Sequence, residues 1–151
     1  LRIRTASILK AFIDKLQERA PHSKILVMGD FNDQPFDKSI GKILGAAPLH
    51  HHSTPEKKAL INLMTPYVGK TGSHKYQGEW AVLDQFIVSS SLLEEGPVSV
   101  KNKEAVIFKA AFLMEADDQY LGYRPKRTYR GYQYHGGFSD HLPVYLDLKI
   151  R

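Results

Sequence analysis

Residues 24–35 read KILVMGDFNDQP, and the rest of the chain can be interpreted around this stretch. Its consecutive apolar residues favour a buried strand over Lys24–Met28, covered on both faces. Gly29 then marks a point where the backbone turns or passes close to another group. Asp30 and Asn32 are two residues apart, so on a continuing extended backbone they point to the same side. A carboxylate beside an amide can hold a water molecule and a phosphate oxygen, although both residue types also favour an ordinary turn.

Two later stretches carry polar groups in a similar setting. Residues 136–145 read GGFSDHLPVY, and Trp80–Val88 reads WAVLDQFIV, an apolar strand interrupted by Asp84. A lone carboxylate in such a strand must lie on a solvated face or be buried with a partner, because an unpaired buried charge is too costly. Taken alone, Asp140 and His141 could simply lie at a capped strand start, with Ser139 and Asp140 bonded to local amides and His141 packed.

The three motifs GDFN, WAVLD and SDH, in this order, resemble those of the endonuclease/exonuclease/phosphatase superfamily of DNase-I-like phosphodiesterases and phosphomonoesterases. The resemblance implies that Asp84 pairs with His141, and that Asp140 is a ligand of a divalent metal. It implies that Asp30 orients or deprotonates the attacking water and that Asn32 hydrogen-bonds a phosphate oxygen. Asp84 would hold the imidazole of His141 in one tautomer and favour its protonation, so that it donates to the developing oxyanion. Without cysteine, an all-oxygen environment favours Mg²⁺ or Mn²⁺ over zinc.

The resemblance also implies the fold class and the extent of the domain. We expect an α/β (α+β) fold that is half of a four-layer sandwich, with mainly antiparallel sheet and flanking helices. Residues 1–151 would be the C-terminal portion of one such domain, with the N-terminal half, including a metal-binding Glu and an Asn, absent before Leu1. We therefore expect weak Mg²⁺ binding by this portion alone. An isolated half would expose an apolar sheet face, so pairing with a second chain is a further expectation.

Periodicity and turn residues predict the other elements. A helix over Thr5–Arg19, capped by Thr5 or Ser7, should bury a stripe of apolar residues, namely Ile8, Leu9, Phe12, Ile13 and Leu16. A short helix over Lys38–Leu44 should end at Gly45. Ser73–Ser89 indicates a hairpin that turns near Gly78 and Glu79. Further segments are a buried run at 60–64, one or two strands over 98–110, a long hairpin after Glu115, and a last strand over 142–150 with Val144, Leu146, Leu148 and Ile150 facing the core.

Aromatic and histidine clusters allow two interpretations each. Five tyrosines alternate with basic residues between 115 and 134, a composition that can stack bases and bind phosphates but that also suits packing. We expect packing for most of them, with the basic side of the hairpin facing substrate. Trp80 should pack in the core or in the site wall. His50, His51 and His52 are adjacent and project in different directions, so we do not expect them to form a metal site.

Composition fits one globular domain and leaves the compartment open. The formal net charge of +5 is compatible with an anionic partner such as nucleic acid, and no apolar run reaches the roughly 20 residues of a membrane helix. Without cysteine there is no disulfide framework, and either a cytoplasmic or an exported protein fits. The sequence predicts metal-dependent hydrolysis of phosphate esters, by a nuclease or a related phosphodiesterase or phosphatase. The alternative is a non-catalytic half-domain or interaction fragment that lacks the metal-binding Glu.

Overall fold

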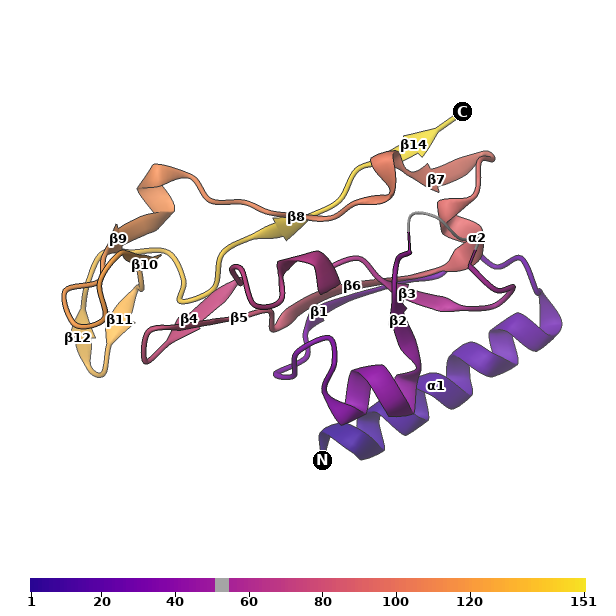
Figure 1. Cartoon of the computed structure of the whole chain (residues 1–151), viewed down its shortest axis with the longest axis horizontal. Helices are drawn as coiled ribbons and strands as arrows, with labels where there is room; N and C mark the ends of the chain where they lie inside the picture. Colours follow the sequence, from indigo (N-terminus) through magenta and orange to yellow (C-terminus); the bar gives the residue numbers. More distant parts are fainter. Residues whose placement is uncertain (51–54) are drawn as a thin grey trace.

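A computed structural model describes residues 1–50 and 55–151 (Figure 1). At its centre is a four-stranded sheet in the order β1-β6-β3-β2, formed by β1 (Leu26–Asp30), β6 (Asp84–Ser89), β3 (Leu60–Asn62) and β2 (Ala46–Pro48). β6 is antiparallel to both of its neighbours, whereas β2 and β3 are parallel. Helices and mainly antiparallel strands confirm the predicted fold class, and the arrangement fits the half-sandwich description.

Strand β6 separates two hydrophobic clusters, one on each face of the sheet. Phe86 and Val88 belong to the larger cluster, while the intervening Ile87 belongs to the smaller cluster beneath α1. This alternation is what a strand's two-residue period produces. The buried Gln85 is fully bonded, since its amide donates to the carbonyl oxygens of Val82 and Asp33 and accepts from the Asn62 side chain. The central strand is thus covered on both faces.

Strand β1 corrects the prediction made from the opening motif. It begins at Leu26 and continues through Gly29 to Asp30 at the edge of the sheet, and Met28 is 65% exposed. Only its first residues pack against the clusters, so it is not a strand covered on both faces. Gly29 has a φ of 141°, a conformation that favours glycine, and a Cβ added there would meet no atom within 4 Å. Its role is conformational and not one of close approach.

Helix α1 (Arg2–Arg19) covers the smaller cluster beside η1 (Lys38–Leu44) (Figure 1). Its buried residues are Ala6, Ile13 and Gln17, whereas Ile8 is 64% and Phe12 is 59% exposed. The predicted stripe is therefore wrong in part: at 100° per residue, Ile8 and Phe12 lie well to one side of the line that faces the sheet.

The predicted caps can be compared with the start of α1 and with the end of η1. Thr5 and Ser7 do not cap α1, because both lie inside it and their hydroxyls donate to the carbonyl oxygens of Leu1 and Ile3. The short helix ends as predicted, since Gly45 caps η1 in the left-handed conformation with a φ of 74°. Glycine at this position leaves no Cβ to strain the turn.

Paired strands extend the sheet region along the long axis of the molecule (Figure 1). The predicted hairpin is present only in its first part, as β4 (His74–Tyr76) and β5 (Glu79–Ala81), which turn at Gln77 and Gly78. Residues 84–89 do not belong to it, because they form β6 and pair with β1 and β3. The other pairs are β7 (Val98–Val100) with β14 (Leu148–Ile150), and β8 (Val106–Ile107) with β13 (Val144–Tyr145). The remaining short elements are η2 (Thr65–Tyr67), α2 (Ser90–Leu93), η3 (Lys101–Lys103) and η4 (Ala111–Leu113).

The last segment differs from the prediction of a single strand over 142–150. It is divided into β13 and β14, which pair with different partners. Val144 and Leu146 pack against the larger cluster as expected, but Leu148 and Ile150 are exposed. The predicted inward face therefore holds only for its first half.

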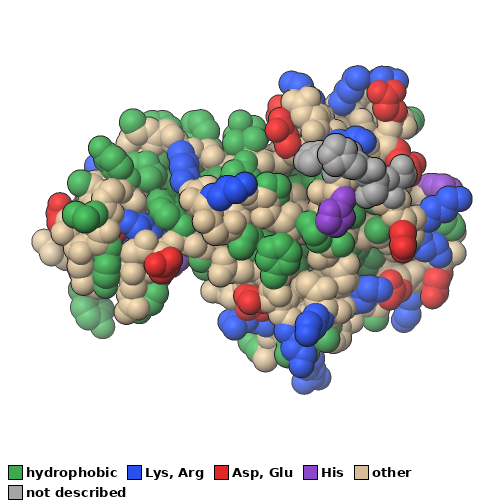
Figure 2. Space-filling view, in the orientation of Figure 1, with side chains coloured by type: hydrophobic (Ala, Val, Ile, Leu, Met, Phe, Trp, Pro, Cys, Tyr) green, Lys and Arg blue, Asp and Glu red, His purple; other side chains and the backbone are tan. Residues whose placement is uncertain are grey.

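The segment after residue 113 forms what we call the aromatic lobe, residues 114–138. It consists of two hairpins, β9 (Met114–Ala116) with β10 (Tyr123–Pro125), and β11 (Tyr129–Arg130) with β12 (Gln133–Tyr134). The lobe lies at one end of the molecule in Figure 1, and hydrophobic side chains cover much of this end in Figure 2. Its five tyrosines are each at least 42% exposed, so the expectation that most of them pack is wrong.

Ion pairs connect the aromatic lobe internally and to its surroundings, in addition to the ring contacts of Tyr129 with Tyr134 and of Phe138 with Phe112. The buried Lys75 of β4 lies 2.9 Å from the Asp117 carboxylate, and Arg124 lies 2.8 Å from Glu115. Arg130 also contacts Glu115, at 3.0 Å. Part of the lobe's positive charge is therefore neutralised by its own acids, which weakens the prediction that its basic side faces substrate.

Candidate functional site

Asp30 and Asn32 contact each other directly at the end of β1. The Asn32 backbone N–H donates to Oδ1 of Asp30 at 2.8 Å, and the Asn32 side-chain amide donates to Oδ2 at 3.2 Å. Asn32 has a φ of 51°, so the backbone turns here and does not continue extended as expected. The carboxylate and the amide are neighbours because Asp30 forms a local turn, which is the geometry that Asn and Asp favour.

The sheet places Asp30 opposite Asp84, the carboxylate expected in the second strand. The two residues are Cα partners in the antiparallel pair of β1 and β6. Asp84 begins β6, just where the buried part of the strand starts, and its side chain is only 16% exposed. The register of the sheet thus brings two carboxylates from distant parts of the sequence to one end of neighbouring strands.

Asp84 also contacts His141, the residue that the family resemblance assigned to it. Nδ1 of His141 lies 2.7 Å from Oδ2 of Asp84. Because the ionised carboxylate only accepts, this nitrogen carries the proton and Nε2 is the free position of the ring. The contact fixes which edge of the imidazole faces solvent.

The backbone around His141 is fixed from both sides. The Ser139 hydroxyl accepts the His141 N–H at 3.0 Å, so the local capping considered for this motif is present together with the contact to Asp84. The Leu142 N–H donates to the Ser73 carbonyl oxygen at 2.7 Å, and His74 and His141 form an isolated antiparallel bridge. The SDH motif therefore lies against the first residue of β4.

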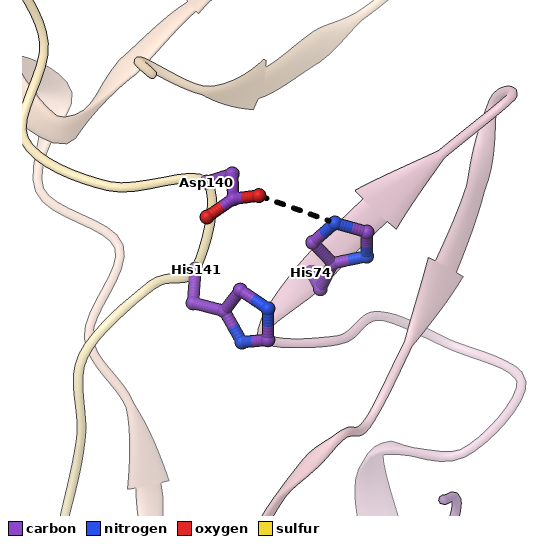
Figure 3. A group of neighbouring side chains, drawn as sticks. All are labelled: His74, Asp140 and His141. Carbon is purple, nitrogen blue, oxygen red and sulfur yellow. Dashed lines mark ion pairs between the residues drawn. The ribbon is translucent and has the colours of Figure 1, made fainter. Parts of the chain in front are cut away.

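His74 completes the cluster, although no motif in the sequence indicates a role for it. Its ring centroid lies 4.7 Å from that of His141, and its Nε2 lies 3.9 Å from Oδ2 of Asp140 (Figure 3). Burial lowers the pKa of His74 below its ordinary value, and the neighbouring His141 acts in the same direction against the opposing charges of Asp140 and Asp30. The sequence does place His74 at the start of a predicted hairpin. That position indicates a role in the site only once the bridge between His74 and His141 is known.

The five residues selected from the sequence thus form a connected group. Hydrogen bonds and strand register link Asn32, Asp30, Asp84 and His141 in turn, and Asp140 is adjacent to His141 in the sequence. Asp140 has 52% of its side chain exposed, so its carboxylate is open to a cation. The arrangement places acceptors, an amide donor and two imidazoles on one surface, a set that can bind a cation and an anionic ester together.

The other candidates lie outside this group. Trp80 packs against the larger cluster, with Nζ of Lys109 4.3 Å from its ring centroid. Burial lowers the pKa of Lys109. Of the three adjacent histidines, His51 and His52 lie outside the described residues, and His50 is exposed.

Comparisons with known proteins agree with this geometry. The model of the Endonuclease/Exonuclease/phosphatase family matches residues 1–150. No curated protein and no solved structure gives a significant match to the chain. Within residues 1–50 and 55–151, none of the helices combines the length and the apolar character needed to cross a bilayer. A match over nearly every residue, on a chain whose distant motifs meet at one surface, shows that the protein belongs to the endonuclease/exonuclease/phosphatase family of phosphoester-hydrolysing proteins.

Proposed function

We propose that the chain carries a divalent-cation-dependent phosphoester hydrolase site of the nuclease or phosphodiesterase type. The observation that supports it best is the 2.7 Å contact between Asp84 and His141, which joins residues 57 positions apart into a carboxylate and imidazole pair. Family membership supports phosphoester hydrolysis in general. The proposal adds the residues, their roles and the need for a cation.

Asp30 and Asn32 would act on the attacking water and on the phosphate. Asp30 accepts two hydrogen bonds from Asn32, yet its oxygens have further lone pairs with which to orient a water molecule and accept its proton. The Asn32 side-chain amide has two N–H donors, of which Asp30 engages one. The second is free for a non-bridging phosphate oxygen.

His141 would stabilise the charge that develops as phosphorus is attacked. Its Nδ1–H is held by Asp84, so a protonated ring presents Nε2–H to solvent and to a bound phosphate. Asp84 acts as a positioning residue, because its contact with Nδ1 fixes the orientation of the ring and leaves Nε2 to face the phosphate. A preorganised donor of this kind is strongest when the negative charge has built up.

The oxygen donors of the site fit Mg²⁺ or Mn²⁺. Asp140 presents an accessible carboxylate, and such ions bind through one or two carboxylates together with waters and substrate phosphate. When bound, the cation would neutralise phosphate charge and acidify a water molecule. The proposal includes a metal-binding Glu from outside residues 1–151. It also includes a second chain that covers the exposed sheet face.

The test is hydrolysis of bis(p-nitrophenyl) phosphate and of single-stranded DNA, with Mg²⁺, with Mn²⁺ and with EDTA, by a protein that carries residues 1–151 together with the expected N-terminal half, because residues 1–151 alone should bind Mg²⁺ weakly. We expect cation-dependent turnover that His141→Ala lowers by roughly 10²- to 10³-fold. His22→Ala, a change at an exposed histidine of the first turn after α1, should leave turnover intact. Turnover that persists in EDTA would contradict the cation requirement. Absence of turnover with either cation would favour the alternative of a non-catalytic module.

A further inference from the structure

We infer that His74, His141 and Asp140 form a binding site for a borderline divalent cation such as Zn²⁺ or Co²⁺. The donor set differs from the all-oxygen environment expected for Mg²⁺, because two of its three members are imidazoles. The inference concerns which ion these side chains can bind and what that ion would do to His141. Only the second of these points rests on the proposed function.

The backbone sets the two histidines opposite each other. His74 and His141 form an antiparallel bridge, and the neighbouring bond from the Leu142 N–H to the Ser73 carbonyl oxygen is 2.7 Å long. Residues that are opposite in this way have Cβ atoms about 4.5–5.5 Å apart, so their side chains leave the sheet on the same face. Two imidazoles at this separation can reach one ion, and the observed ring separation of 4.7 Å agrees with that geometry.

The available nitrogen and oxygen atoms converge. One donor atom from each of His74, Asp140 and His141 lies within 4.8 Å of the other two, as the grouping in Figure 3 shows. Ligands about 2.0–2.1 Å from a tetrahedral zinc ion are roughly 3.4 Å apart, so side-chain movements of about 1 Å would complete the site. The 3.9 Å between His74 and Asp140 is already close to that value.

Asp84 prepares His141 for this role. Its carboxylate accepts from Nδ1, which leaves Nε2 as the ring nitrogen that can bind an ion. A carboxylate behind a metal-binding histidine is a recurring arrangement, since it fixes the tautomer and raises the basicity of the ligand nitrogen. In this protein Asp84 supplies the supporting carboxylate, and it is already bonded to His141.

The chemistry of the three side chains selects the ion. Two imidazoles and one carboxylate make the three-ligand set of open zinc sites, with the fourth position left to water or to an anion. Mg²⁺ prefers oxygen ligands and gives up its water reluctantly, so these imidazoles offer it little. The nearby charges of Asp84 and Asp30 also favour a cation at this surface.

Binding of such an ion would block the proposed use of His141. Donation to a phosphate oxygen requires a proton on Nε2, whereas a metal ion requires the lone pair of the same atom. The two states exclude each other. Zn²⁺ should therefore inhibit Mg²⁺-supported hydrolysis, and His74 should set how sensitive the chain is to Zn²⁺.

Binding is tested without substrate. Calorimetric titration with Zn²⁺ should show one site, and Co²⁺ should acquire the intense visible bands of tetrahedral coordination. We expect His74→Ala and Asp140→Asn each to weaken Zn²⁺ binding at least tenfold, whereas His22→Ala should bind as the unaltered chain does. Asp140→Asn is nearly isosteric at an exposed position, so it tests the site even if His74→Ala fails to fold. Unchanged Zn²⁺ affinity in folded His74→Ala or in Asp140→Asn would overturn the inference, as would a Co²⁺ spectrum identical to that of the hydrated ion.

Inhibition is tested separately with bis(p-nitrophenyl) phosphate and saturating Mg²⁺, in the protein that carries residues 1–151 together with the expected N-terminal half. With each rate normalised to the variant's own rate without Zn²⁺, the Zn²⁺ concentration for half inhibition should rise at least tenfold in His74→Ala and remain unchanged in His22→Ala. Equal sensitivity of His74→Ala and the unaltered chain would overturn the role given to His74. If no hydrolysis is seen at all, the proposed function fails, and the titrations still decide the metal site.

Discussion

Asp30 and Asp84 lie directly opposite each other at one end of the antiparallel pair of β1 and β6. Two like charges in this relationship destabilise a sheet, by roughly 0.2–1 kcal/mol when they are exposed. A fold that keeps both carboxylates accepts a local cost, which is common where side chains serve a site and not the core.

Asp30→Asn should therefore stabilise the chain by a few tenths of a kcal/mol and at the same time reduce hydrolysis. An asparagine keeps an acceptor for the Asn32 N–H but removes the charge that faces Asp84. Urea unfolding at low and high salt measures the effect, which should shrink as salt screens the repulsion. A loss of stability in Asp30→Asn at low salt would show that the two carboxylates do not repel each other appreciably.

His141→Ala and Asp84→Asn should not act independently on hydrolysis. Removing a donor to the developing oxyanion typically lowers kcat by roughly 10²- to 10³-fold. Asp84 acts through His141, to which it is bonded at 2.7 Å, so the double variant should be little slower than His141→Ala alone and KM should hardly change. Steady-state kinetics of the three variants make the comparison. If the two losses multiplied, the residues would be working separately.

The ion pair between Lys75 and Asp117 should make stability depend on pH. The hydrogen bond from Lys75 holds the pKa of Asp117 below its ordinary value. A depressed carboxyl pKa contributes stability above the unfolded value of about 3.9, and the contribution is lost as the pH falls through the folded value. Asp117→Asn should therefore lower the melting temperature at pH 7, with a difference from the unaltered chain that narrows below about pH 4.

The exposed neighbour Asp118 provides the matched control for that measurement. Asp118→Asn should leave the melting temperature nearly unchanged at pH 7 and at pH 3, because an exposed surface charge contributes little to stability. A constant gap between Asp117→Asn and the unaltered chain from pH 7 to pH 3 would show that the charge of Asp117 is not what stabilises the fold.

Gly137→Ala should displace the backbone that leads into the SDH motif, which begins two residues later at Ser139. A Cβ at Gly137 would overlap the carbonyl group of Lys126, in a segment where the Phe138 N–H donates to that same carbonyl oxygen. Overpacking of this kind costs roughly 1–3 kcal/mol, and the shift should move the following SDH motif and slow hydrolysis. Gly41→Ala is the control, because a Cβ there would meet its nearest atom at 3.5 Å. Denaturant unfolding that shows equal stability for both variants would contradict the proposed overlap.

Local chemistry and the family resemblance together predicted much of the fold and the grouping of the residues of the candidate site. The glycine that ends η1 and the turn at Gln77 and Gly78 follow from backbone preferences of nearby residues, and both are present. The contact between Asp84 and His141 was expected because three motifs in one order imply one site. These features depend on short stretches of sequence or on a pattern shared by a family.

The errors concern contacts that only the assembled chain defines. An apolar stripe indicates a helix but not which part of the stripe faces the sheet, so the exposure of Ile8 and Phe12 was missed. The tyrosines of the aromatic lobe were expected to pack, but ion pairs connect the lobe and leave the rings exposed. His74 had no motif of its own, since its importance arises from a bridge to a residue far along the sequence.

The central position of β6 has a consequence for the order in which the protein can fold during synthesis. In the four-stranded sheet, β6 pairs with β1 on one side and with β3 on the other. The sheet therefore cannot connect β1 to β3 and β2 until residues 84–89 have left the ribosome. Until then the nascent chain holds β1 without its strand partner, a state that favours association with chaperones. The His141 side of the site emerges later still, so a nascent chain whose residues 84–89 have left the ribosome while residues 139–141 have not would carry an assembled sheet with an incomplete site.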